Sequence, residues 1–256
     1  MKDNLLQIAI QTAILAGKSI LEIYEEDDFE VEQKADATPI TRADKAAHQL
    51  IMEALSKTEL PIISEEGRLT DYEERKSWKH FWLVDPLDGT KEFIKKNGEF
   101  TVNIALIEDE RSVLGVIYAP VSGELYYGKV GEGAVKAFYK DGKITEEKAL
   151  PLEQSEREYC IVVASRSFKD EKTEQYISEI PQKVKTVSRG SSLKLCMVAE
   201  GTADVYPRFV HLKEWDIAAG VAIVEAAGKS VVNAETNKKI RFNSKTLQAP
   251  YFIAKN

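Results

Sequence analysis

Residues 82–90 read WLVDPLDGT and carry two aspartates, Asp85 and Asp88, directly after an apolar stretch. Pro86 fixes its φ angle, and Gly89 permits backbone conformations that a β-carbon would obstruct. Apolar residues on both faces of the preceding segment predict a strand in a sheet that is covered on both sides. We therefore expect a buried strand that delivers two carboxylates, three residues apart, into a tight turn.

Carboxylates at the end of a buried strand cost free energy unless positive charge lies between them. Mg²⁺ supplies such charge and prefers hard oxygen ligands, a few carboxylates together with water. The carbonyl of Leu87, between the two aspartates, is a further oxygen ligand. A turn capped by its own aspartates is the alternative interpretation of this motif.

Two other acidic positions favour a metal site. Glu65 and Glu66 follow the apolar pair 62–63, and Asp216 opens an apolar helical stretch. A solvated charge pair and a helix N-cap are the respective alternatives. The histidines share no ligand spacing, which argues against a zinc site with nitrogen ligands. They are His48, His80 and His211.

The composition is that of a soluble globular protein. The chain has 256 residues, 43% hydrophobic and 30% charged, with a formal net charge of −7 and no basic tail, which excludes a sequence-independent nucleic-acid binder. We find no uninterrupted apolar run of the ~18 residues that a membrane span needs. Cys160 and Cys196 lack metal or redox spacing and are expected to be buried free thiols in a reducing cytoplasm.

Hydrophobic periodicity predicts mainly antiparallel strands in the first half of the chain and an α/β pattern in the second. The first half has helices at 2–24 and after Thr41, where Asp44 completes a capping box, and strands at 61–63, 80–84, 101–107, 113–118, 124–130 and 134–139. The second half has strands at 159–164, 184–187, 203–206 and 230–233 and helices at 169–179, 192–200 and 216–227. The polar stretch 140–158 suggests subdomains at 1–145, with the Asp85–Thr90 motif, and 146–256, with Asp216.

Residues 190–194, GSSLK, begin a predicted helix after a strand. The free N–H groups and the dipole of such a helix start attract an anion. Arg189 and Lys194 add positive charge at this point. Plain helix capping by Ser191 is the alternative.

Taken together, these residues resemble the inositol monophosphatase superfamily. The resemblance rests on three motifs in the family's order: residues 65–66, residues 85–90 with Phe93, and residues 215–220. Segments 82–106 and 190–209 are similar to its 3'(2'),5'-bisphosphate nucleotidase branch. The resemblance implies an α/β (α+β) fold, a layered α-β-α-β-α sandwich of the inositol monophosphatase and fructose bisphosphatase type. It also implies hydrolysis of adenosine 3',5'-bisphosphate to AMP and phosphate by metal-activated water, with two or three Mg²⁺ ions per active site.

The resemblance also implies roles for individual residues. The metal ligands would be Glu65, Asp85, Leu87, Asp88 and Asp216. The catalytic residues would be Thr90, Asp44 and Glu65, with Thr90 and Asp44 orienting and deprotonating the attacking water. The substrate contacts would be Glu65, Leu87, Asp88, Gly89, Thr90, Ser192, Lys194, Arg208, Glu214 and Asp216.

One position departs from the nucleotidase pattern. Phe168 stands where these enzymes usually have a histidine, so inositol monophosphate and fructose 1,6-bisphosphate remain rival substrates. Two further classes of protein stay open at this point. One is a haloacid-dehalogenase-like phosphatase, which forms a covalent phosphoenzyme, and the other is a non-catalytic metal- or nucleotide-binding module.

The resemblance further implies lithium sensitivity and a role in sulfur assimilation. We expect a cytoplasmic monomer or homodimer without a transmembrane segment, and peripheral association with the inner face of the cell membrane stays open.

Overall fold

The computed structural model describes the chain except for residues 1, 27–30, 34–38, 154–156 and 165–169. Phe168, the position that departs from the nucleotidase pattern, lies outside the described residues. In the described part, two large sheets and the helices around them form layers, and the first half of the chain adds three small elements. These are α3 (Tyr72–Arg75), α4 (Thr90–Ile94) and the two-stranded sheet of β1 (Glu32–Gln33) and β2 (Pro39–Ile40).

Two helices from the start of the chain cover one face of the first sheet. They are α1 (Lys2–Tyr24) and α2 (Arg42–Ser56), and both match the predicted helices. Thr41 caps α2: its hydroxyl accepts the Ala43 N–H at 3.2 Å, and Asp44 accepts the Thr41 N–H at 2.7 Å. This capping box, predicted with aspartate in place of glutamate, is confirmed. It also fixes the side chain of Asp44, which lies at the candidate site.

The first sheet has seven strands in sequence order, from β3 to β9. β3 and β4 are parallel, and every later neighbour pair is antiparallel, as the short turns predicted. The strands are β3 (Ile62–Ser64), β4 (His80–Asp88), β5 (Thr101–Glu108), β6 (Arg111–Ala119), β7 (Glu124–Lys129), β8 (Gly133–Lys140) and β9 (Lys143–Leu150). β9 was not predicted, because its exposed residues alternate too little in polarity.

The predicted end of β4 at Val84 is wrong. β4 continues to Asp88, and Asp85 and Asp88 pair with Asn103 and Thr101 across an irregularity of register. A bulge inserts residues into one strand and re-aims its side chains. The two aspartates therefore lie on a bulged strand end that the sheet still holds, which restrains them more than a free turn would.

The second sheet has five strands in the order β11-β10-β12-β16-β14. β10 is parallel to β11 and β12, and β16 is antiparallel to both of its neighbours. The strands are β10 (Tyr159–Ala164), β11 (Lys183–Ser188), β12 (Val205–Arg208), β14 (Ser230–Asn233) and β16 (Phe252–Lys255). A further small sheet pairs β13 (Leu212–Lys213) with β15 (Gln248–Ala249).

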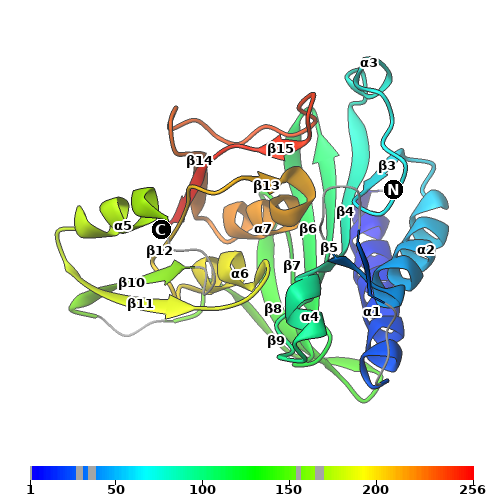
Figure 1. Ribbon diagram of the computed structural model, residues 1–256, viewed down its shortest axis with the longest axis horizontal. Coiled ribbons are helices and arrows are strands. Elements are labelled where there is room, and N and C mark those ends of the chain that lie inside the picture. Colours follow the sequence, from blue (N-terminus) through cyan, green and yellow to red (C-terminus); the bar gives the residue numbers. More distant parts are fainter. Residues whose placement is uncertain (1, 27–30, 34–38, 154–156, 165–169) are drawn as a thin grey trace.

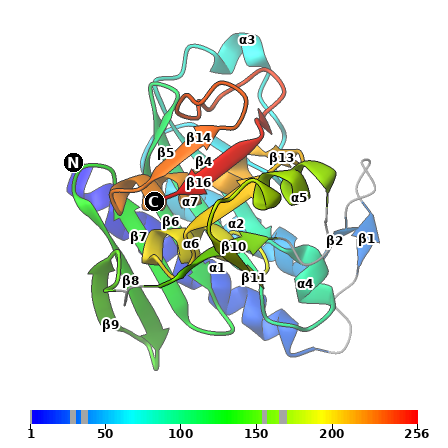
Figure 2. The same cartoon turned by 90° about the vertical axis from the view of Figure 1, so that its left-hand side faces the viewer.

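The second-half helices are α5 (Glu171–Ser178), α6 (Leu193–Glu200) and α7 (Glu214–Ala226). α6 and α7 lie between the two sheets, and α5 lies on the outer face of the five-stranded sheet (Figures 1 and 2). Alternation along β10 explains this, because Val163 faces the central core while Val162 faces the cluster beneath α5. The layer order is α1/α2, sheet, α6/α7, sheet, α5, so the predicted α-β-α-β-α sandwich is confirmed.

The division of the chain between residues 145 and 146 stays a prediction. That position lies inside β9, which belongs to the seven-stranded sheet. A boundary drawn from sheet membership would follow Leu150 instead. The predicted buried free thiols, Cys160 and Cys196, are confirmed.

Helix α1 is long and apolar enough to cross a membrane, over residues 4–24. Half of its apolar window is buried inside the protein, and the helix packs against α2 and β6. A core helix of a soluble protein passes the same test of length and hydropathy.

Close packing of α7 requires small residues on its neighbours. A β-carbon at Gly115 of β6 would lie 2.2 Å from the Ala219 carbonyl oxygen of α7. We expect Gly115→Ala to lower the free energy of unfolding by about 1–3 kcal/mol, the cost of overpacking a core. Gly67→Ala is the control, since its nearest neighbour would lie at 3.4 Å. Urea denaturation measures both, and equal stability of the two variants would contradict the prediction.

Candidate active site

Three acidic side chains from separate elements meet at one end of the seven-stranded sheet. Glu65 follows β3, Asp85 lies near the end of β4, and Asp216 lies in the first turn of α7. One carboxylate oxygen of each lies within 4.8 Å of the others. The structure thus brings together three of the residues that the sequence predicted as metal ligands, although 151 positions separate the first from the last.

Strand register explains how Glu65 and Asp85 come together. β3 runs parallel to β4 with Ser64 opposite Val84, so the next residue of each strand reaches the same sheet edge. The Glu65 N–H donates to the Val84 carbonyl oxygen at 3.1 Å and extends this pairing. The Leu87 N–H donates to Asp85 Oδ1 at 3.1 Å and orients that carboxylate.

Asp216 comes from the helical layer rather than from the sheet. Its Oδ2 accepts the Lys213 N–H at 2.9 Å, as a capping side chain does. The predicted helix start at Asp216 and the N-cap alternative are wrong, because α7 begins at Glu214 and Lys213 is its N-cap. Asp216 is the third residue of α7, and its side chain bonds back to the cap residue while it also lies close to Glu65 and Asp85. The start of a helix stabilises negative charge, so the position suits a carboxylate.

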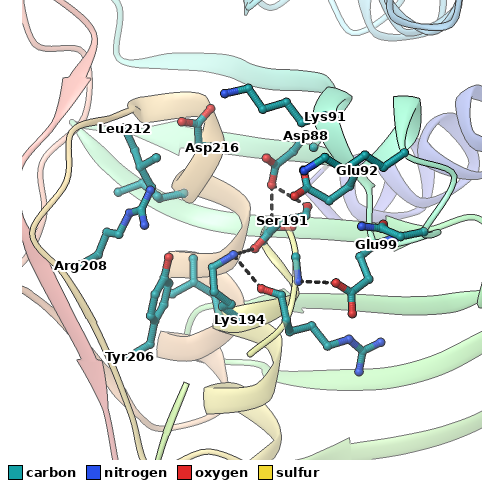
Figure 3. Close-up of a pocket in the computed structure, with 18 residues that line it drawn as sticks. Asp88, Lys91, Glu92, Glu99, Ser191, Lys194, Tyr206, Arg208, Leu212 and Asp216 are labelled. Carbon is teal, nitrogen blue, oxygen red and sulfur yellow. Dashed lines mark hydrogen bonds between the residues drawn. The ribbon is translucent and has the colours of Figure 1, made fainter. Parts of the chain in front are cut away.

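Asp88 ties the metal motif to the second half of the chain. Its Oδ2 accepts the Ser191 hydroxyl and the Ser192 N–H, both at 2.7 Å (Figure 3). The same oxygen accepts the Asn103 amide at 3.4 Å. The Thr101 hydroxyl bonds to the hydroxyls of both Ser191 and Ser192. These contacts hold one oxygen of Asp88.

Thr90 and Asp44 form the hydrogen-bonded pair that the resemblance implied. The Thr90 hydroxyl donates to Asp44 Oδ1 at 3.2 Å. The Leu87 carbonyl oxygen lies 3.4 Å from the Thr90 hydroxyl oxygen. Asp44 is 1% exposed, and its Oδ2 accepts the hydroxyl and the N–H of Thr41. Gly89 precedes Thr90 with φ of +98°, a conformation that favours glycine.

Burial has the largest effect on the electrostatics of the carboxylates, and their mutual repulsion adds to it. Burial, with the charges of Glu65, Asp88 and Asp216, raises the pKa of Asp85 well above its usual range. Burial, with the charges of Asp88 and Glu65, likewise raises the pKa of Asp216. Negatively charged oxygen ligands, gathered in a partly buried space, fit a hard divalent cation such as Mg²⁺.

A cavity of about 500 Å³ opens beside Asp88 and Asp216. Residues from both halves of the chain line it: Gly89 and the α4 lysine Lys91 on one side, Ser192, Lys194 and Arg208 on the other. Figure 3 shows Asp88 and Asp216 at one end of this space and Lys194 and Tyr206 toward the other. Burial lowers the pKa of Lys194 to about 8, and Arg208 acts in the same direction.

Glu214, predicted to contact substrate, is not among the described residues that line this cavity. It is 1% exposed and accepts the backbone N–H groups of Asn243 and Ser244 at 2.6 and 2.9 Å. Burial raises its pKa, and these hydrogen bonds act against the rise.

Sequence reasoning missed several residues of the site. Asn103 was predicted only as part of an apolar strand, yet it is 1% exposed and bonds to Asp88, Thr101 and Ser192. A polar residue inside an apolar strand was the available signal, because buried amides need partners. Glu99, which accepts the Gly190 N–H, carried no such signal.

A family model described as the inositol monophosphatase family matches residues 1–256. The chain belongs to the inositol monophosphatase family. This assignment replaces the haloacid-dehalogenase-like alternative. The family is metal-dependent, in agreement with the acidic cluster of Glu65, Asp85 and Asp216.

Individual relatives agree with the family. The chain is 44% identical over 230 residues to 3'(2'),5'-bisphosphate nucleotidase CysQ of Salmonella typhimurium, covering 89% of each chain. It is 43% identical over 234 residues to CysQ of Escherichia coli K12, covering 90% of this chain and 89% of that one. The crystal structure of CysQ from Bacteroides thetaiotaomicron is 46% identical, with a TM-score of 0.89 and 98% and 97% of the two chains covered.

Removal of one charge from the cluster should stabilise the metal-free protein. In EDTA we expect Asp85→Asn to raise the midpoint of thermal unfolding by about 2–4 °C, the shift that about 1 kcal/mol produces in a chain of this size. Mg²⁺ should stabilise the wild type through preferential binding to the folded state and should no longer stabilise the variant. The exposed Asp109→Asn is the matched control. A lower midpoint of Asp85→Asn in EDTA, with the Mg²⁺ effect retained, would contradict this account.

Proposed function

We propose that this protein is a metal-dependent 3'(2'),5'-bisphosphate nucleotidase, a phosphoric monoester hydrolase that converts adenosine 3',5'-bisphosphate to AMP and phosphate. The observation that carries the proposal is the convergence of Glu65, Asp85 and Asp216 beside a cavity with cationic side chains. The curated relatives named as nucleotidases support the choice of substrate class.

We assign the metal to Mg²⁺, two or three ions per site. Its ligands are Glu65, Asp85, Asp88, Asp216 and the carbonyl oxygen of Leu87. Bound divalent ions lower the pKa of water and offset the charge that develops on a transferring phosphoryl group. We assign Oδ1 of Asp88 to the metal, since its Oδ2 accepts the bonds from Ser191 and Ser192.

Thr90 and Asp44 position the attacking water in this proposal. The Thr90 hydroxyl donates its hydrogen bond to Asp44, which leaves a lone pair of the Thr90 oxygen to accept a hydrogen bond from the attacking water. As water gives a proton to Thr90, Thr90 passes its own proton to Asp44, the final acceptor. Two bonds from Thr41 keep Asp44 in place as the acceptor. A base held at hydrogen-bonding distance is the geometric requirement of general base catalysis. The N–H groups of Gly89 and Thr90 are proposed to hold the phosphate.

The cavity supplies the proposed nucleotide contacts. Its volume of about 500 Å³ lies within the range of small-molecule sites. Lys194 and Arg208 bring positive charge for a second phosphate, and Ser192 offers a hydroxyl. A role in sulfur assimilation, lithium sensitivity and a cytoplasmic location follow from the same proposal.

A substrate comparison tests the proposal directly. Phosphate release with Mg²⁺ should be fastest for adenosine 3',5'-bisphosphate among three substrates at equal concentration, the others being inositol 1-phosphate and fructose 1,6-bisphosphate. Asp85→Asn should lower turnover by about 10²–10³-fold or more, as loss of one contact that stabilises the reacting charge does. Asp109→Asn should retain wild-type turnover. Faster release from inositol 1-phosphate would overturn the substrate, and no release from any compound would overturn the enzyme class.

Lys194 makes substrate binding sensitive to pH. Its charge is present below its pKa of about 8 and is lost as the pH rises through that value. The KM for adenosine 3',5'-bisphosphate should therefore rise up to about tenfold between pH 7 and pH 9, since about one lysine in ten stays charged one unit above its pKa. Lys194→Met should show a high KM that does not change over this range. A flat KM in the wild type would argue against the Lys194 contact.

A further inference from the structure

Asp216 reaches the cluster from a different layer than Glu65 and Asp85 do. β3 and β4 hold those two through strand pairing, whereas the position of Asp216 depends on where the first turn of α7 lies. Metal ligands must be held within a fraction of an ångström of their productive positions. Contacts that fix the start of α7 therefore also fix the position of Asp216 for metal binding.

Glu214 is the first residue of α7, two residues before Asp216. Each of its carboxylate oxygens accepts one backbone N–H of the 243–244 turn, from Asn243 and from Ser244. The Glu214 N–H in turn donates to the Leu247 carbonyl oxygen at 2.9 Å. The start of α7 is thus bonded in both directions to one segment of loop.

Arg75 holds that same loop from the other side. It is 3% exposed, and it donates to Asn243 Oδ1 at 2.6 Å and to the Ser244 and Lys245 carbonyl oxygens at 2.9 Å. The Asn243 amide returns a bond to the Arg75 carbonyl oxygen at 2.7 Å. Arg75 ends α3, which lies beyond one end of the seven-stranded sheet in Figure 1, on the segment that begins with Glu65.

We infer that Glu214, Asn243 and Arg75 form a positioning cluster that fixes Asp216 against Glu65 and Asp85 for metal binding. This inference rests on the metal site of the proposed function and assigns Glu214 to positioning in place of substrate contact. Glu214 suits the role because both of its oxygens already accept bonds from the loop. The cluster joins three segments far apart in the chain: residues 70–75, the start of α7 and residues 243–245.

Glu214→Gln tests the inference, because one carboxylate oxygen becomes an amide donor that faces a backbone N–H. Mn²⁺ is the probe, and electron paramagnetic resonance measures its binding to the full chain without substrate. We expect the dissociation constant of Mn²⁺ to rise about tenfold, the lower end of the losses seen when groups that orient metal ligands are changed. Asn243→Ala, which removes both side-chain bonds to Arg75, should weaken Mn²⁺ binding in the same direction.

Glu225→Gln is the matched control on the same helix. Glu225 lies near the far end of α7 and pairs with Arg111 and Lys239 at 3.2 and 3.0 Å. This variant should lower the midpoint of thermal unfolding and keep Mn²⁺ affinity within about twofold, since its helix end is remote from Asp216. It separates positioning from a general loss of stability.

Two results would overturn the inference. One is wild-type Mn²⁺ affinity in both Glu214→Gln and Asn243→Ala. The other is a raised KM for adenosine 3',5'-bisphosphate at saturating metal with unchanged Mn²⁺ affinity, which would make Glu214 a substrate contact.

Asp216→Asn separates this inference from the proposed function. If Asp216→Asn weakens Mn²⁺ binding and the wild type releases no phosphate, the proposed function fails and the positioning role stands. If Asp216→Asn leaves Mn²⁺ binding unchanged, both fail.

Discussion

Repulsion between closely spaced carboxylates in a partly buried site is the constraint on which this structure depends. Asp85 and Asp216 are held close to Glu65 and Asp88, and burial together with that proximity raises the pKa values of Asp85 and Asp216. Flexible segments would relieve such repulsion by moving apart. The site therefore needs rigid elements that force the charges together and so create affinity for a cation.

The layered fold provides this rigidity in two ways. Parallel pairing of β3 with β4 brings Glu65 and Asp85 to one sheet edge, and α7 brings Asp216 to the same point from the next layer. α7 can approach closely because small residues line its contacts, with Gly115 beneath it and Gly220 against α6. Packing at this density leaves little freedom for the helix to shift.

Much of this arrangement could be predicted from local sequence, and the rest depended on distant contacts. Capping at Thr41 and the antiparallel strands after Phe100 follow from short-range patterns, so they matched the structure. β16 was missed although its pairing joins β12 to β14, because four residues at the end of the chain carry too little periodicity. The full length of β4 was missed because pairing with β5 continues through a proline motif that locally resembles a turn.

The partners of Glu214 and Asp88 lay beyond sequence reasoning for a related reason. An acidic residue beside a metal motif looks the same whether it faces substrate or a loop, and only the fold brings Asn243 to Glu214. Asp88 links the two halves of the chain: it lies close to Asp85 and Asp216, and its Oδ2 accepts bonds from Ser191 and Ser192, which line the cavity. Any movement of the 191–192 segment on ligand binding changes the hydrogen bonding of Asp88. The cavity and the carboxylates are therefore one connected unit, in which each half of the chain supplies what the other lacks.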